Sequence, residues 1–155
     1  MNSNIRKRLL GALVGIGRAA ESSAHLIDRS LDLYVLKALA ACNDSNISDG
    51  EAIEFVRAIN EEKAILVPDC SSCSAPCGRT DDYDLDMMNE ESTDIINIKE
   101  QIISATINKA SDLLPRAEDG ESLLLFPFYR ALYSMGARDW TLDNYQSVID
   151  EINSL

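Results

Sequence analysis

The chain lacks several features that mark common protein classes. Only one of its 155 residues is a histidine, which leaves little material for a triad of nucleophile, base and acid. It contains no glycine-rich phosphate loop and no dinucleotide-binding fingerprint. No apolar run approaches the length of a membrane span, and no internal repeat or β-type alternation is present. The sequence therefore argues against a triad hydrolase, a nucleotide-dependent enzyme and a membrane-spanning protein.

Basic residues are also scarce. The chain has 14 Lys and Arg against 26 Asp and Glu, which gives a formal net charge of −12. Nucleic acids and anionic membranes are bound through clusters of Lys and Arg, so we expect neither as a partner. With 46% apolar and 26% charged residues, the composition predicts a soluble globular protein with a single domain over residues 1–155.

The N-terminus loosely resembles a secretion signal, because three basic residues at 6–8 precede an apolar run at 9–17. However, Arg18 and Glu21 interrupt the run, and the apolar repeat continues in register beyond them. Clustered cysteines without a disulfide framework also fit a reducing compartment. We therefore expect the protein to be cytoplasmic.

Apolar residues recur at steps of three and four, which predicts helices. Residues 5–41 fit either one long helix or two helices broken near 17–23. Ser48 and Glu51 form a capping box for a helix that buries Ile53, Val56, Ile59 and the stem of Lys63 and ends near residue 66. An isoleucine-rich helix should cover 91–114 and end at Pro115.

Two further helices are expected in the last third of the chain. The first follows residue 120 and either starts or kinks at Pro127, and Gly136 is a candidate left-handed C-cap. The second covers 141–152, with Thr141 as its N-cap and Trp140 packed on Tyr145. The predicted fold is thus an all-α, up-and-down bundle of about five helices.

The segment with the clearest chemical potential is a cysteine-rich loop at 68–80. Cys70, Cys73 and Cys77 have the spacing C-x2-C-x3-C, with only small or polar residues and one proline between them. Three thiols within eight positions are more typical of a metal site than of a disulfide scaffold. A 4Fe–4S cluster, a zinc ion and no metal at all, with free thiols or a disulfide, remain alternatives.

A four-coordinate site needs a further ligand, which Cys42 or His25 could supply through the fold. Each residue also has a simpler interpretation. Cys42, at a helix end, fits a small buried hydrophobic residue, and His25 fits a hydrogen-bonded packing residue on an apolar helix face.

Two stretches carry a resemblance to a known family. Cys77-Gly-Arg-Thr80 leads into the isoleucine-rich helix, and residues 128–149 form an apolar helix, a turn and a second helix. Over roughly residues 70–155 this order resembles the N-terminal helical domain of the hybrid-cluster proteins (hydroxylamine reductases), relatives of the carbon monoxide dehydrogenases. The family's loop holds one iron–sulfur cluster with four widely spaced cysteines, whereas this sequence has only Cys70, Cys73 and Cys77 in the corresponding segment. The family's larger catalytic domains are absent.

The resemblance implies a stand-alone cluster-binding helical protein with a redox or electron-transfer role and a redox partner protein, without autonomous hydroxylamine reduction. The alternative is a non-catalytic interaction module or homodimer whose cysteine loop is structural. Glycines at 11, 15 and 17 and a wide apolar stripe on the first helix motivate this second hypothesis, because an excess of apolar surface suggests a partner.

Overall fold

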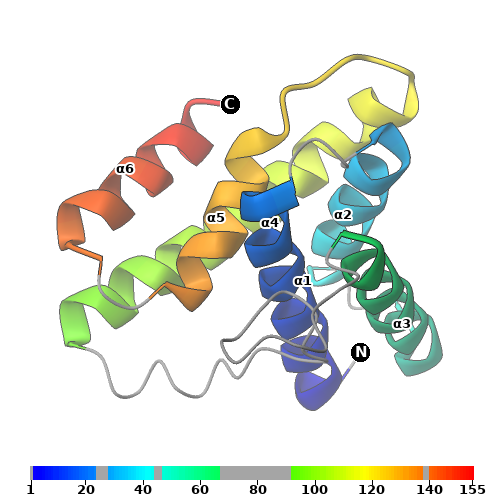
Figure 1. Cartoon of the computed structure of the whole chain (residues 1–155), viewed down its shortest axis with the longest axis horizontal. Helices are drawn as coiled ribbons and strands as arrows, with labels where there is room; N and C mark the ends of the chain where they lie inside the picture. The colour runs from blue at the N-terminus through cyan, green and yellow to red at the C-terminus, as the bar shows by residue number, and fades with distance from the viewer. Residues whose placement is uncertain (1, 24–27, 44–46, 67–91, 138–139) are drawn as a thin grey trace.

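The computed structural model describes residues 2–23, 28–43, 47–66, 92–137 and 140–155 (Figure 1). These residues form helices and no strand, which confirms the all-α prediction. The helices number six in the described ranges, rather than about five. They are α1 (Ser3–Ser23), α2 (Arg29–Ala41), α3 (Asp49–Leu66), α4 (Thr93–Glu118), α5 (Phe126–Gly136) and α6 (Leu142–Asn153).

The extra helix comes from the first segment, which forms two helices. Glycines at 15 and 17 remain helical, so the division falls after Ser23 and not within 17–23. The second helix starts at a conventional cap, because the Asp28 carboxylate accepts the Leu31 N–H at 2.9 Å.

Helix α3 confirms most of its sequence prediction. The Ser48 hydroxyl accepts the Glu51 N–H at 3.2 Å and donates to the Glu51 carboxylate at 3.2 Å. The prediction that Ile53 is buried was wrong, since its side chain is 43% exposed. Its neighbour Ala52 instead lies on the buried face, in register with Val56.

Pro115 does not end α4, contrary to prediction. The helix continues for almost one more turn to Glu118 and ends where Gly120 adopts a φ of 91°. The N–H groups of Gly120 and Glu121 then donate to the carbonyls of Ala117 and Arg116, both at 3.1 Å. This Schellman arrangement satisfies the last carbonyls and explains why the glycine, not the proline, sets the end.

Helix α5 begins at Phe126, so Pro127 lies in its first turn rather than at a kink. Gly136 is the last helical residue, and Gly120 is the only described residue with positive φ, so the left-handed C-cap predicted at Gly136 was wrong. A buried lysine closes this helix end instead. The Lys99 ammonium donates to the carbonyls of Ala137 at 2.8 Å and Met135 at 3.4 Å.

Helix α6 starts as predicted. The Thr141 hydroxyl accepts the Asn144 N–H at 3.4 Å, and the ring centroids of Trp140 and Tyr145 are 5.4 Å apart. The Tyr145 hydroxyl donates to the Ala137 carbonyl at 3.0 Å, which ties α6 to the end of α5.

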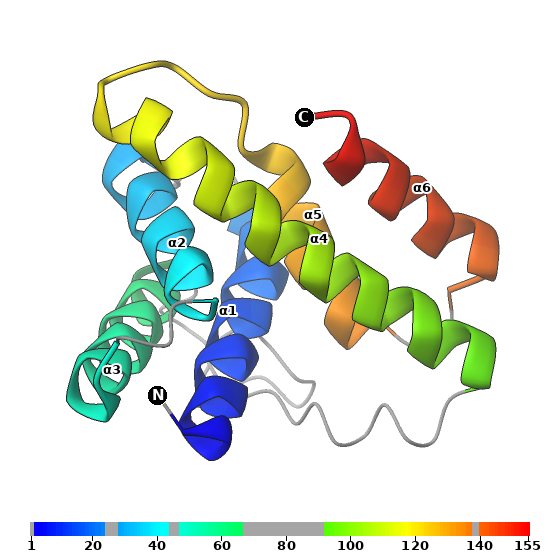
Figure 2. The ribbon, with the colours of Figure 1, turned by 180° about the vertical axis from the view of Figure 1, so that it is seen from behind.

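Helix α1 forms the centre of the larger core, where it packs against α3 and α5, while α4 packs against α2 and α6 (Figures 1 and 2). Glycines permit both close approaches of α1. A Cβ on Gly17 would lie 2.7 Å from the Leu132 Cβ of α5, and one on Gly15 would lie 2.8 Å from the Lys63 Nζ of α3. At Gly15 and Gly17, the surface of α1 is therefore covered by helices of the same chain.

The buried apolar residues form two adjacent clusters. The larger one contains most of the buried side chains of α1, α2 and α3, and a smaller one joins α6 to α4 and α5. Ile103 and Leu155 pack against both clusters, so the two cores are continuous.

Candidate functional site

The residues predicted to bind a metal fall mostly outside the described ranges. Cys70, Cys73, Cys77 and His25 all lie there, so their roles remain predictions. The helix ends on either side of the cysteine segment are described. Leu66 is buried in the larger core at the end of α3, and the Ser92 hydroxyl caps α4 by accepting the Ile95 N–H at 3.3 Å.

Cys42 is the one described cysteine, and it is buried in the larger core at the end of α2. Its thiol donates to the Ala38 carbonyl at 3.4 Å, and the Arg6 side chain donates to the Cys42 carbonyl at 3.1 Å. Burial raises the pKa of the Cys42 thiol to about 12, with only partial opposition from the Arg6 charge. Because metal ligation requires the thiolate, this environment favours the interpretation of Cys42 as a small core residue.

The described acids offer no alternative metal centre. No group of three or more His, Cys, Asp or Glu side chains that could hold a metal ion occurs in the part of the chain that the structure describes.

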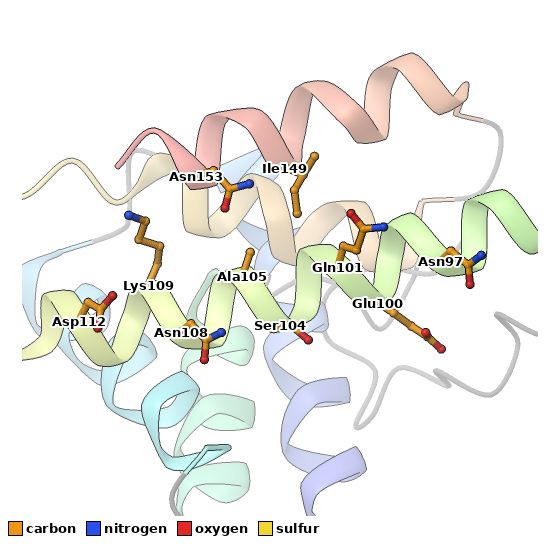
Figure 3. A pocket seen from close by; sticks show the side chains of 10 residues that line it. All are labelled: Asn97, Glu100, Gln101, Ser104, Ala105, Asn108, Lys109, Asp112, Ile149 and Asn153. Carbon is orange, nitrogen blue, oxygen red and sulfur yellow. The ribbon is translucent and has the colours of Figure 1, made fainter.

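An open surface hollow of about 700 Å³ lies along α4, with two lining residues from α6 (Figure 3). Figure 3 shows Gln101, Ala105 and Lys109 directed from α4 toward α6, with Glu100 on the opposite side of the helix. The Lys109 ammonium is engaged with the Leu155 carbonyl at 2.6 Å. The polar side chains of this hollow point to different sides of α4, and most of them are exposed. The hollow is therefore a solvated surface. Its lining consists of Asn97, Glu100, Gln101, Ser104, Ala105, Asn108, Lys109, Asp112, Ile149 and Asn153.

A smaller pocket of about 170 Å³, here called the Asp32 pocket, brings polar groups closer together than the hollow along α4 does. It lies where the start of α2 meets the end of α4, two segments that Figures 1 and 2 both place side by side. Its lining consists of Asp28, Arg29, Asp32, Leu33, Ala117, Glu121, Ser122, Leu123 and Leu125. Next to it, the hydroxyl of the buried Tyr129 on α5 donates to the Asp32 carboxylate at 2.8 Å.

The electrostatics of this pair are unusual for a helix surface. Burial raises the pKa of Asp32, with a further increase from Asp28, while the Tyr129 hydrogen bond and Arg29 oppose the shift. Burial and the Asp32 charge raise the pKa of Tyr129, so the phenol stays protonated and acts as a donor. The pocket thus retains a half-buried acid, Asp32. The Tyr129 hydrogen bond and the Arg29 charge offset only part of the cost of burying its negative charge.

Sequence reasoning missed this pair. Asp32 and Tyr129 are 97 positions apart, and the helical pattern assigned Tyr129 to an apolar stripe. One local signal was available, because Asp32 interrupts the apolar run of α2 between Leu31 and Leu33. Its partner could be found only from the folded structure, in which the Tyr129 side chain of α5 reaches Asp32 on α2.

Comparison with known proteins gives no match to this chain among protein-family models, curated proteins or solved structures. The resemblance to the hybrid-cluster proteins therefore remains a prediction. Among the helices in the described ranges, none combines the length and apolar character needed to cross a membrane.

Proposed function

We propose that this chain is a small helical protein that binds an iron–sulfur cluster through Cys70, Cys73 and Cys77. Its role would be electron transfer or redox sensing with a partner protein in a reducing, cytoplasmic setting. The observation that carries the proposal is the clustering of three of the four thiols within eight positions of one segment. The fourth thiol, Cys42, is engaged with a backbone carbonyl inside the core.

The donor set fits this class of cofactor. Thiolates are the usual ligands of iron–sulfur clusters, and such a cluster exchanges single electrons when it is bound. Three thiolates leave one position of a 4Fe–4S cluster for His25, solvent or a group from a second chain. In sequence, the segment is flanked by α3, whose last residue Leu66 is buried in the core, and by α4, which is capped by Ser92.

Zinc is the main alternative metal, and a non-catalytic interaction module or homodimer is the alternative function. One ground for a dimer is the glycine-bearing face of the first helix, but at Gly15 and Gly17 this face is covered by α3 and α5 of the same chain. Two apolar residues still favour a partner surface, because Leu124 is 75% exposed and Phe126 is 55% exposed. Light scattering that reports a monomer would remove the homodimer.

Metal content in matched cysteine variants tests the proposal. The wild type should be purified without oxygen and compared with Cys73→Ser and with Cys42→Ala. We expect iron, sulfide and absorbance at about 400 nm in the wild type and in Cys42→Ala, and loss of all three in Cys73→Ser. Equal loss in the two variants would indicate a folding effect, whereas a colourless, metal-free wild type would overturn the proposal.

A further inference from the structure

We propose that the Asp32 pocket binds a small organic cation, a primary ammonium with a short apolar chain, and that the Asp32 carboxylate is its counter-ion. This site lies on α2 and on the connection between α4 and α5. It draws on none of the four cysteines, so the inference is independent of the proposed metal function.

The first argument is the incomplete pairing of Asp32. One carboxylate oxygen accepts the Tyr129 hydroxyl at 2.8 Å, and Asp32 forms no ion pair with any residue in the described ranges. Arg29, the basic residue of the described lining, interacts with the Asp32 charge but directs a guanidinium nitrogen to the Ala117 carbonyl at 3.3 Å. A partly desolvated carboxylate with a hydrogen bond but no bound cation is costly, and an ammonium ligand would offset that cost.

The second argument is the charge of the lining. Among the described residues, Asp28, Asp32 and Glu121 bring three negative charges to the pocket, and Arg29 and the Glu121 partner Arg116 bring two positive charges, so the net charge is −1. The other two acids already have partners, because Asp28 caps α2 and Glu121 is held by Arg116 at 2.9 Å. Asp28 and Glu121 are exposed, whereas Asp32 is half-buried and has one carboxylate oxygen engaged, so Asp32 is the acid whose charge gains most from a cation, and the acidic surroundings repel anions.

The third argument is shape and polarity. Leu33, Ala117, Leu123 and Leu125 contribute apolar atoms beside the carboxylate, in a lining that is otherwise mainly polar. The volume of about 170 Å³ lies below the roughly 300–1,000 Å³ typical of sites for drug-sized ligands, so the occupant must be small. One accepting charge with apolar atoms beside it suits a small alkylammonium ion better than a hydrated metal ion, which needs several oxygen ligands.

The experiment uses n-butylammonium as the probe and follows backbone amide shifts by NMR at pH 7 and constant ionic strength. We expect saturable shifts at Leu33, Leu123 and Leu125 with millimolar affinity, and no saturable shifts with n-butanol or butyrate. Asp32→Asn keeps the shape and an acceptor for Tyr129 but removes the charge, and it should weaken binding by about tenfold or more. Asp143→Asn, on the exposed start of α6, is the matched control and should bind like the wild type.

Three results would overturn the inference. They are the absence of saturable binding to the wild type, equal binding by Asp32→Asn, and equal binding of n-butanol. Each would leave the Asp32–Tyr129 hydrogen bond as a cross-link between helices and nothing more. Because Asp32→Asn retains the hydrogen-bonding geometry, its amide spectrum also verifies that the fold is intact.

Discussion

Tyr129 and Asp32 are joined by a 2.8 Å hydrogen bond that links α5 to α2 across 97 positions of sequence. The bond leaves a half-buried acid whose pKa is raised, chiefly because burial penalises its charged form. Functional sites often retain such groups at a cost in stability. The pair therefore gives a prediction about folding that is separate from ligand binding.

Asp32→Asn should be more stable than the wild type at pH 7. The folded-state pKa of Asp32 lies above its ordinary value of 3.8, so the folded state binds this proton more tightly than the unfolded state does. The contribution of Asp32 to stability is thus lost as the pH rises from the unfolded-state pKa through the folded-state pKa. Melting temperatures between pH 3 and 8 should show the gap between variant and wild type opening as the pH rises. A variant that is less stable at every pH would show that the ionised carboxylate stabilises the fold.

Gly17→Ala should destabilise the protein more than Gly15→Ala. A Cβ at 17 would lie 2.7 Å from both the Leu132 Cβ and the Tyr133 backbone nitrogen, so α1 and α5 must move apart. A Cβ at 15 meets the end of the flexible Lys63 side chain instead. We expect a loss of about 1–3 kcal/mol for Gly17→Ala, and a smaller change for Gly15→Ala because alanine also favours the helix. Urea unfolding measures both, and equal stabilities would contradict the close packing of α1 on α5.

Lys99→Met should cost about 1–3 kcal/mol of unfolding free energy. The Lys99 ammonium donates to the carbonyls of Met135 and Ala137, and it lies 5.3 Å from the centroid of the Tyr145 ring. Methionine fills similar space but leaves the Met135 carbonyl without this donor. Lys109→Met, which removes a less buried bond to the Leu155 carbonyl, is the control and should change stability less. No loss in Lys99→Met would mean that the buried ammonium contributes nothing to closing α5.

Cys42 should be the slow thiol in a chemical labelling experiment. Its pKa is raised to about 12 by burial, so almost no thiolate is present at pH 8. After metal removal under reducing conditions, a disulfide-exchange reagent should modify Cys42 of the native chain only on unfolding. Cys42→Ala should abolish the slow phase alone. Rapid labelling of all four thiols would contradict the buried position of Cys42.

The pattern of apolar residues predicted where helices form, because the period of three to four survives even across Gly15 and Gly17. It could not settle boundaries that depend on backbone conformation. Pro115 and Gly136 both resemble helix ends in sequence, yet the positive φ that ends α4 belongs to Gly120. A carbonyl–lysine contact from another helix closes α5, which a local pattern does not encode.

Candidate sites formed by neighbours in sequence could be predicted, whereas those formed by residues from different helices could not. A cluster such as Cys70, Cys73 and Cys77 can be read from sequence because its members are neighbours along the chain. The Asp32–Tyr129 pair and the buried Lys99 could not be predicted, since each depends on side chains from helices that meet only in the folded protein. In the sequence, Lys99 was simply one charged residue within an isoleucine-rich helix.

The most direct test of the proposed function is the amount of iron and acid-labile sulfide per chain in wild-type protein prepared without oxygen. A single 4Fe–4S cluster predicts about four of each per chain. Zinc without sulfide, or no bound metal, would contradict the assignment of Cys70, Cys73 and Cys77 as ligands of an iron–sulfur cluster.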